Sequence, residues 1–134
     1  MKEKDIQSLF GKKIDQMGVF ELKLCKGPSI SFSAVSEHQE ESLSKVEREG
    51  LYYKISDAPF GHSTGFRFHA PKPFDCFFVK EIPAYVVVVF YRPREKKVAH
   101  FVRIGQWLSM KETCGRKSAT REMVENAAER TLDL

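Results

Sequence analysis

The sequence predicts an α/β domain in which helices flank one mixed β-sheet. Two observations indicate this class. Segments with apolar residues at helical spacing alternate along the chain with segments whose apolar residues occur at every second position. Residues 84–91 form an apolar run that contains four consecutive valines, which is typical of a strand buried on both faces. Because the 134 residues show no repeat and no long linker, we expect a single domain over 1–134.

The first two elements should be a helix over 3–14 and a strand over 18–25. In the strand, charged and apolar side chains alternate, as they do when one face is buried. The helix has one apolar stripe at helical spacing. The stripe contains Ile6, Leu9, Phe10 and Ile14.

A second helix should begin after a short extended piece over 29–35. Ser36 is followed three residues later by Gln39, which is the pattern of a capping box. The helix that this box opens should run to about Arg48, and Gly50 is well placed to end it.

The middle of the chain should supply most of the remaining strands. We expect a strand over 51–55, an irregular loop over 57–72, and a β-hairpin of residues 74–79 with 83–91. A further strand should follow over 98–104. The run at 84–91 is too short to cross a membrane, so it is interpreted as a buried strand.

The C-terminal part is predicted to be helical. Trp107 begins a short helical segment, and Ser118 or Thr120 could cap a last helix that ends near Leu132. The domain would therefore carry a helical extension over about 116–132. Its apolar stripe would be formed by Met123, Val124, Ala127 and Ala128.

Composition limits the classes of function. The net charge is +4, with 22 basic and 18 acidic residues, and this mild excess permits a polyanionic partner. We see no signal peptide and no membrane span. The three cysteines are widely spaced and fit neither a disulfide framework nor a zinc site. A cytoplasmic location is therefore expected. The sequence also lacks a P-loop, a G-x-S-x-G elbow and a zinc finger.

The strand over 18–25 carries the most informative motif. Glu21 and Lys23 lie on one face, and Phe20, Leu22 and Leu24 lie on the other. Nucleases that use Mg²⁺ need this pairing, because the carboxylate holds the metal and the lysine positions or activates the attacking water.

The bland alternative is that a half-exposed strand simply shows charges on its wet face. A second E-x-K triplet at 95–97 lies in an expected polar turn, and we assign it no function. Asp75 offers a second acid, since a charged residue at the start of a strand with aromatic neighbours needs a partner, which could be a metal. A turn-capping role for Asp75 is the alternative.

Several other residues could contact a nucleic acid. His38 and Gln39 stand at a helix N-terminus, which attracts phosphate, although Gln39 is also explained by its capping role. Basic side chains could together form a groove that follows a phosphate backbone, although each is also explained as solvated surface. The residues that we select for this role, besides His38, are Lys26, Lys72, Arg116 and Lys117.

These motifs resemble those of the PD-(D/E)xK nucleases, specifically the RecU-like Holliday-junction resolvases and related phage proteins. The similarity covers about residues 18–56, where an E-x-K strand is followed by an H-Q helix start and then by a strand after glycine. The matching segments are 19–23, 30–32, 37–39 and 50–55, and later 72–75 and 84–87.

The resemblance implies a restriction-endonuclease-like fold and a metal-dependent, structure-selective DNA endonuclease that serves recombination or repair. On this interpretation Glu21 and Asp75, with the Leu22 carbonyl, bind Mg²⁺ or Mn²⁺. Lys23 is the catalytic lysine, and Gln39 holds phosphate or water. Gln39 matches the polar residue that opens the next helix. The partner would be branched DNA, and the enzyme would be a homodimer.

The sequence departs from the family in one respect. The family has an aspartate on a strand before the E-x-K strand, whereas only Asp15 precedes it closely here. Asp75 could replace that ligand if its strand lay beside the first, and Glu3 or Asp5 could contribute from the first helix. Two alternatives therefore stay open: a non-catalytic nucleic-acid-binding relative, and a protein-interaction module.

Overall fold

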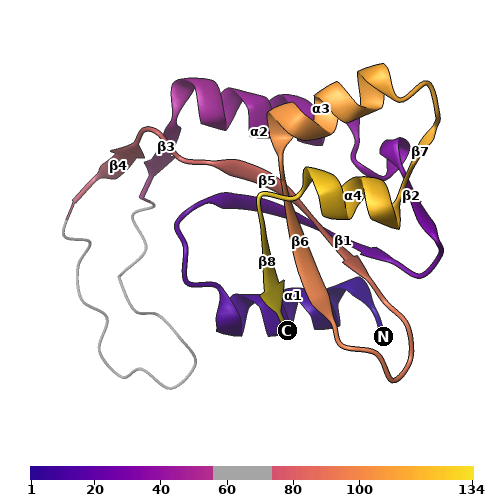
Figure 1. The fold of residues 1–134 in the computed structure, drawn as a ribbon. Coiled ribbons are helices and arrows are strands. Elements are labelled where there is room, and N and C mark those ends of the chain that lie inside the picture. The colour runs from indigo at the N-terminus through magenta and orange to yellow at the C-terminus, as the bar shows by residue number, and fades with distance from the viewer. Residues whose placement is uncertain (56–73) are drawn as a thin grey trace.

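The computed structural model describes residues 1–55 and 74–134, and its centre is a four-stranded mixed sheet (Figure 1). The strand order is β1-β5-β6-β8. β1 and β5 are parallel, whereas β5 with β6 and β6 with β8 are antiparallel. The strands are β1 (Val19–Cys25), β5 (Ala84–Phe90), β6 (Val98–Arg103) and β8 (Arg130–Asp133). The predicted mixed α/β class is confirmed.

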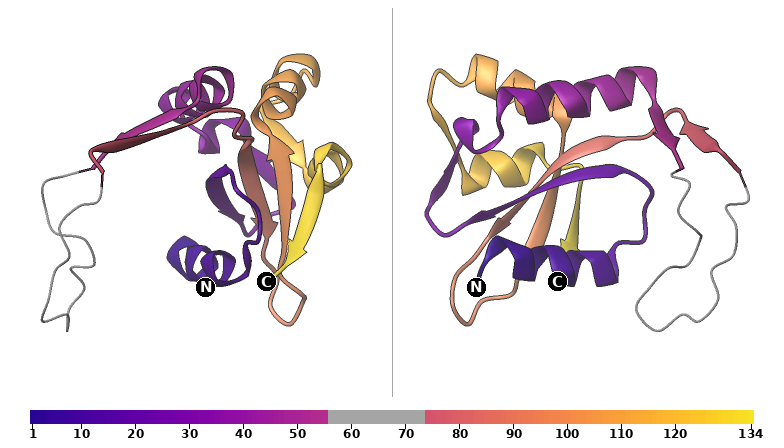
Figure 2. Two further views of the ribbon diagram at one scale, coloured as in Figure 1. Left: turned by 90° about the vertical axis from the view of Figure 1, so that its left-hand side faces the viewer. Right: turned by 180° about the vertical axis from the view of Figure 1, so that it is seen from behind.

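Helices cover both faces of this sheet (Figure 2). On one face, α1 packs Ile6 and Phe10 against Val87, Val89 and Phe101. On the other face, α2, α3 and α4 cover a second apolar cluster that includes the alternate β5 residues and the fully buried Trp107. The helices are α1 (Glu3–Lys13), α2 (Glu37–Glu49), α3 (Ile104–Thr113) and α4 (Arg121–Ala127).

Two small antiparallel sheets lie outside the central one. β2 (Ser29–Ser31) pairs with β7 (Ser118–Thr120), and a short 3₁₀ helix, η1 (Phe32–Ala34), follows β2. β3 (Leu51–Lys54) pairs with β4 (Cys76–Val79) to form a ribbon that projects from the body (Figures 1 and 2).

Most local predictions for the first half of the chain are confirmed, but the expected extended piece over 29–35 is a strand only to Ser31, after which η1 forms. α1, β1, α2 and β3 lie within about one residue of their expected ranges. The capping box forms, since Gln39 N–H donates to Ser36 Oγ at 3.1 Å and Ser36 N–H donates to Gln39 Oε1 at 3.0 Å. Gly50 ends α2 with φ +90°, and a Cβ there would lie 2.6 Å from the Val79 carbonyl oxygen.

The predicted hairpin of residues 74–79 with 83–91 is wrong. β4 pairs with β3, and β5 lies between β1 and β6. Every residue of β5 is buried, and such a strand needs neighbours on both edges and cover on both faces. β1 supplies one edge after the crossover through α2. β4 does not suit this place because its Phe77 and Phe78 side chains are exposed.

The predicted helical extension over 116–132 is also only partly right. Thr120 caps α4 by accepting from Met123 N–H at 3.2 Å, but the helix ends at Ala127. The chain then forms β8, whose Leu132 packs on the α1 side of the sheet and completes its edge. The segment is therefore strand, helix and strand, within the same domain.

No helix in the described part combines the length and apolar character that a bilayer crossing requires. The expected irregular loop over 57–72, which includes Lys72, lies outside the described residues.

Candidate active site

The two faces of β1 carry different side chains, as the alternation predicts. Phe20, Leu22 and Leu24 pack in the cluster under α1. Glu21 and Lys23 point to the opposite side, toward α2. This strand therefore presents two charged groups beside the start of a helix while its other face is held in the core.

Glu21, Lys23 and Gln39 form one hydrogen-bonded cluster. Lys23 Nζ lies 3.0 Å from Glu21 Oε1, and Gln39 Nε2 donates to the same oxygen at 2.8 Å. The side chains of Lys23 and Glu21 are 14% and 28% exposed, so the pair is partly shielded from water. Three residues that the sequence analysis selected are thus brought together from two elements.

The amide of Gln39 is fixed at both of its polar atoms. Its Oε1 accepts from Ser36 N–H in the capping box, and its Nε2 donates to Glu21. The capping role of Gln39 is therefore confirmed, and the same side chain also contacts Glu21. The cap sets the direction in which the Nε2 group can donate, and this orients the Glu21 carboxylate.

A pocket of about 260 Å³ opens beside the cluster, between β1 and α2. Its polar lining consists of Glu21, His38, Gln39 and Ser42, with apolar residues behind them. Ser42 was missed by the sequence analysis. Its position four residues after His38 on α2 places the two side chains on one helix face, and this spacing could have revealed it.

The main-chain oxygen of Leu22 lies at the free edge of β1. At the two ends of β1, Val19 N–H donates to the Pro83 carbonyl and the Cys25 carbonyl accepts from Tyr91 N–H, just before and just after β5. Leu24 N–H points the other way and donates to Glu3 Oε2 at 3.5 Å. Odd-numbered residues of β1 therefore direct their main-chain groups to β5, and even-numbered ones direct theirs outward. Leu22 belongs to the second set, so its carbonyl points away from β5.

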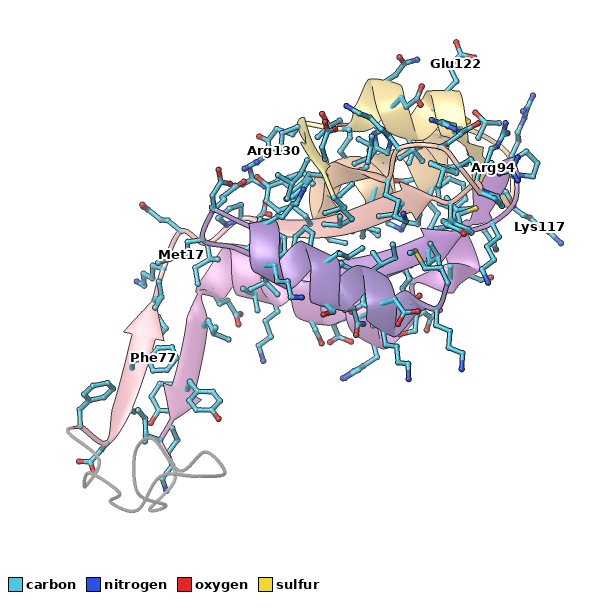
Figure 3. All side chains as sticks on the ribbon, turned by 90° about the horizontal axis from the view of Figure 1, so that it is seen from below. Met17, Phe77, Arg94, Lys117, Glu122 and Arg130 are labelled. Carbon is cyan, nitrogen blue, oxygen red and sulfur yellow. The ribbon has the colours of Figure 1, made fainter. Side chains whose placement is uncertain are left out.

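The structure does not bring Asp75 to this cluster, because the strand that follows it, β4, pairs with β3 and does not lie beside β1, as its proposed role as a metal ligand required. Asp75 precedes β4 at the far end of the ribbon, where its carbonyl accepts from Ile55 N–H at 2.8 Å. β1 has β5 as its neighbour among the described strands. The labelled Phe77 on β4 shows how far the ribbon extends from the body (Figure 3).

The other candidate acids are distributed around α1. Asp15 Oδ1 accepts from both terminal nitrogens of Arg130 at 3.2 Å. Asp5 accepts from Lys2 N–H at 2.8 Å, and only Glu3 of these three has a bond to β1. Within 1–55 and 74–134, no three His, Cys, Asp or Glu side chains form a group suited to a metal.

The basic residues selected from the sequence are dispersed. Lys26 is exposed in the turn after β1, and His38 lines the pocket beside Glu21. Arg116 and Lys117 line a different pocket, between η1 and the loop after α3.

Comparisons of this chain with protein-family models, curated proteins and solved structures found no match.

Proposed function

We propose that this protein is a metal-dependent, structure-selective DNA endonuclease, similar to the Holliday-junction resolvases and with a restriction-endonuclease-like fold. The observation that carries the proposal is the meeting of Glu21, Lys23 and Gln39 at one carboxylate oxygen. The three residues are chosen from the sequence resemblance. They meet because the chain passes from β1 into α2, which lies over the same face of the sheet. The parallel pairing of β1 with β5 supports the same fold.

The oxygen donors beside β1 suit Mg²⁺ or Mn²⁺. Both bonds to Glu21 use Oε1, so Oε2 and the Leu22 carbonyl would be the atoms that hold a metal. Mg²⁺ prefers oxygen ligands and usually keeps several waters, so one or two protein ligands are enough. When bound, the ion would polarise a phosphoryl oxygen and lower the pKa of a coordinated water.

The protein's own side chains would then position the reactants. Lys23 would orient the attacking water and stabilise the negative charge that develops on the phosphorus oxygens. Gln39 would keep Glu21 in place, and His38 and Ser42 could donate to a phosphate in the adjoining pocket. Because a four-way junction needs two symmetric cuts, we expect a two-fold homodimer.

The proposal is tested by incubating the protein with a labelled four-way junction and a matched linear duplex, each with Mg²⁺, Mn²⁺ or EDTA. The site variant is Glu21→Gln. Its control is Glu41→Gln, which makes the same change on the exposed surface of α2. We expect paired, metal-dependent nicks in the junction, which Glu21→Gln loses and Glu41→Gln retains. Absence of both cleavage and DNA binding would overturn the proposal.

A specific observation favours a second candidate, a nucleic-acid-binding protein without catalysis. Glu21 is the carboxylate of the described cluster, and Asp75 lies elsewhere. A site with one acid can still bind DNA through its cations, with an affinity that falls as salt rises. Tight, salt-sensitive binding of the junction without cleavage in any metal would establish this candidate in place of the first.

A further inference from the structure

A second pocket, of about 340 Å³, lies at the end of the molecule that carries Lys117 (Figure 3). Its lining residues are Ser31, Phe32, Ser33, Lys111, Arg116 and Lys117. We call it the Lys111 pocket. Its three cationic side chains supply only donors, and its two hydroxyls can also donate. A ligand that accepts hydrogen bonds at several oxygens and carries negative charge would match this lining.

The floor of the Lys111 pocket is fixed by the backbone and by aromatic packing. Phe32 N–H donates to the Lys117 carbonyl at 3.0 Å, which continues the pairing of β2 with β7. The Phe32 ring is buried against Trp107, with 5.3 Å between the ring centres. Ser31 Oγ and Ser33 Oγ lie 2.7 Å apart, so the hydroxyls are held together at the rim.

Lys111 is held in place by a buried carboxylate. Its Nζ lies 2.8 Å from Glu40 Oε1, and Glu40 is only 9% exposed. A buried carboxylate is costly without a partner, so this pair keeps the ammonium beside the pocket. The charge of Glu40 offsets that of Lys111. Arg116 and Lys117 are exposed and add two further positive charges, so the pocket keeps a net positive charge.

The Lys111 pocket and the Glu21 cluster share the first turn of α2. Gln39 holds Glu21 on one side of this turn, and the next residue, Glu40, holds Lys111 on another. The capping box of Ser36 fixes the turn itself. A nucleic-acid strand whose phosphate lies at Glu21 can therefore meet a second group of donors, one of which, Lys111, is held by Glu40 of the same helix.

We propose that the Lys111 pocket binds a backbone phosphodiester of the nucleic-acid strand that is engaged at Glu21. The proposal rests on the proposed DNA substrate, but it does not require cleavage. The same donors would also accept a free phosphate ion, so the test separates these two sources.

The test measures binding of a labelled four-way junction in EDTA over a range of salt concentrations, so that no cleavage occurs. The variant Arg116→Gln/Lys117→Gln changes two exposed side chains and leaves the Lys111–Glu40 pair in place. Its control, Lys12→Gln/Lys13→Gln, removes two exposed cations from α1, on the opposite face of the sheet. We expect the pocket variant to lose affinity by at least about 10-fold and its log–log salt slope to fall by about 1, because the contact with one phosphate contributes about 1.

The control should stay within about twofold of wild-type affinity, since its cations lie outside the proposed path. Equal affinity losses in both variants, or none in the pocket variant, would overturn the proposal. An amide-shift titration with inorganic phosphate distinguishes the source. Shifts at residues 116 and 117 without junction binding would assign the pocket to free phosphate and overturn the nucleic-acid assignment. Junction binding that depends on the pocket, in a protein that never cuts, would remove the nuclease function and leave this inference intact.

Discussion

At the first turn of α2, polar side chains are held by one another, whereas on the β3–β4 ribbon aromatic side chains lie open to solvent. Gln39 and Glu40 each hold a partner from another element. On the ribbon, Tyr53 and Phe77 stack with ring centres 5.4 Å apart, but they are 57% and 40% exposed. Because the proposed phosphodiester chemistry needs charged groups kept in place, we expect it at the α2 end and not on the ribbon.

The largest difference between the regions should appear in stability. Trp107 is fully buried beneath the Lys111 pocket, and its indole N–H has no hydrogen-bond partner among the described residues. Trp107→Ala should therefore lower the free energy of unfolding by about 3–5 kcal/mol through lost packing alone. Phe78→Ala, on the exposed ribbon, should cost less than about 1 kcal/mol. Urea unfolding of both variants measures this contrast, and equal losses would contradict it.

The next prediction separates the two roles of Gln39. Gln39→Ala removes the side-chain acceptor for Ser36 N–H and the bond to Glu21, whereas Ser36→Ala removes the other half of the capping box and leaves the bond to Glu21 in place. Each should destabilise α2 by about 1 kcal/mol. Only Gln39→Ala should also slow cleavage, by about 10- to 100-fold, because it no longer orients the Glu21 carboxylate. Single-turnover cleavage rates at saturating Mg²⁺ test this, and similar rates for both variants would show that Gln39 acts only as a cap.

A smaller effect is expected in the pH dependence of stability. Burial of His100 on β6 lowers its pKa below the ordinary value of 6.5; nearby Arg121 lowers it further, and Glu125 opposes the shift. The unfolded chain therefore takes up the proton first. The contribution of His100 to stability is complete above pH 6.5 and is lost as the pH falls through the lowered pKa, by at most about 1.4 kcal/mol per pH unit.

The measurement is the free energy of unfolding of wild type and His100→Gln at several pH values below and above 6.5. The variant should show a shallower decline on the acid side. Parallel curves for the two proteins would contradict the role of His100.

The sequence predicts well those features that depend on neighbours along the chain. The alternation around Glu21 identifies both faces of β1, and the spacing of Ser36 and Gln39 identifies the start of α2. The pairing of β5 could not be predicted in this way, because its partner β1 lies 65 residues earlier and is chosen by burial on both faces rather than by the nearby turn.

Part of what was missed did leave a pattern in the sequence. Leu132 and Leu134 alternate with polar residues, which is typical of a strand, but the helical stripe through Val124 and Ala127 obscured it. The Lys111–Glu40 pair left no comparable pattern, since its members are 71 residues apart. The composition of the site could thus be predicted in part, whereas its contacts required the fold.

The measurement that tests the central claim most directly is the single-turnover cleavage rate of a four-way junction by Glu21→Ala and Asp75→Ala, beside wild type, at saturating Mg²⁺. If the chemistry belongs to the α2 end, Glu21→Ala loses cleavage and Asp75→Ala cuts at a rate within about threefold of wild type, because Asp75 lies on the ribbon away from the cluster. If Asp75→Ala loses cleavage as completely as Glu21→Ala while both remain folded, the ribbon supplies a catalytic group and the division between the two regions is wrong.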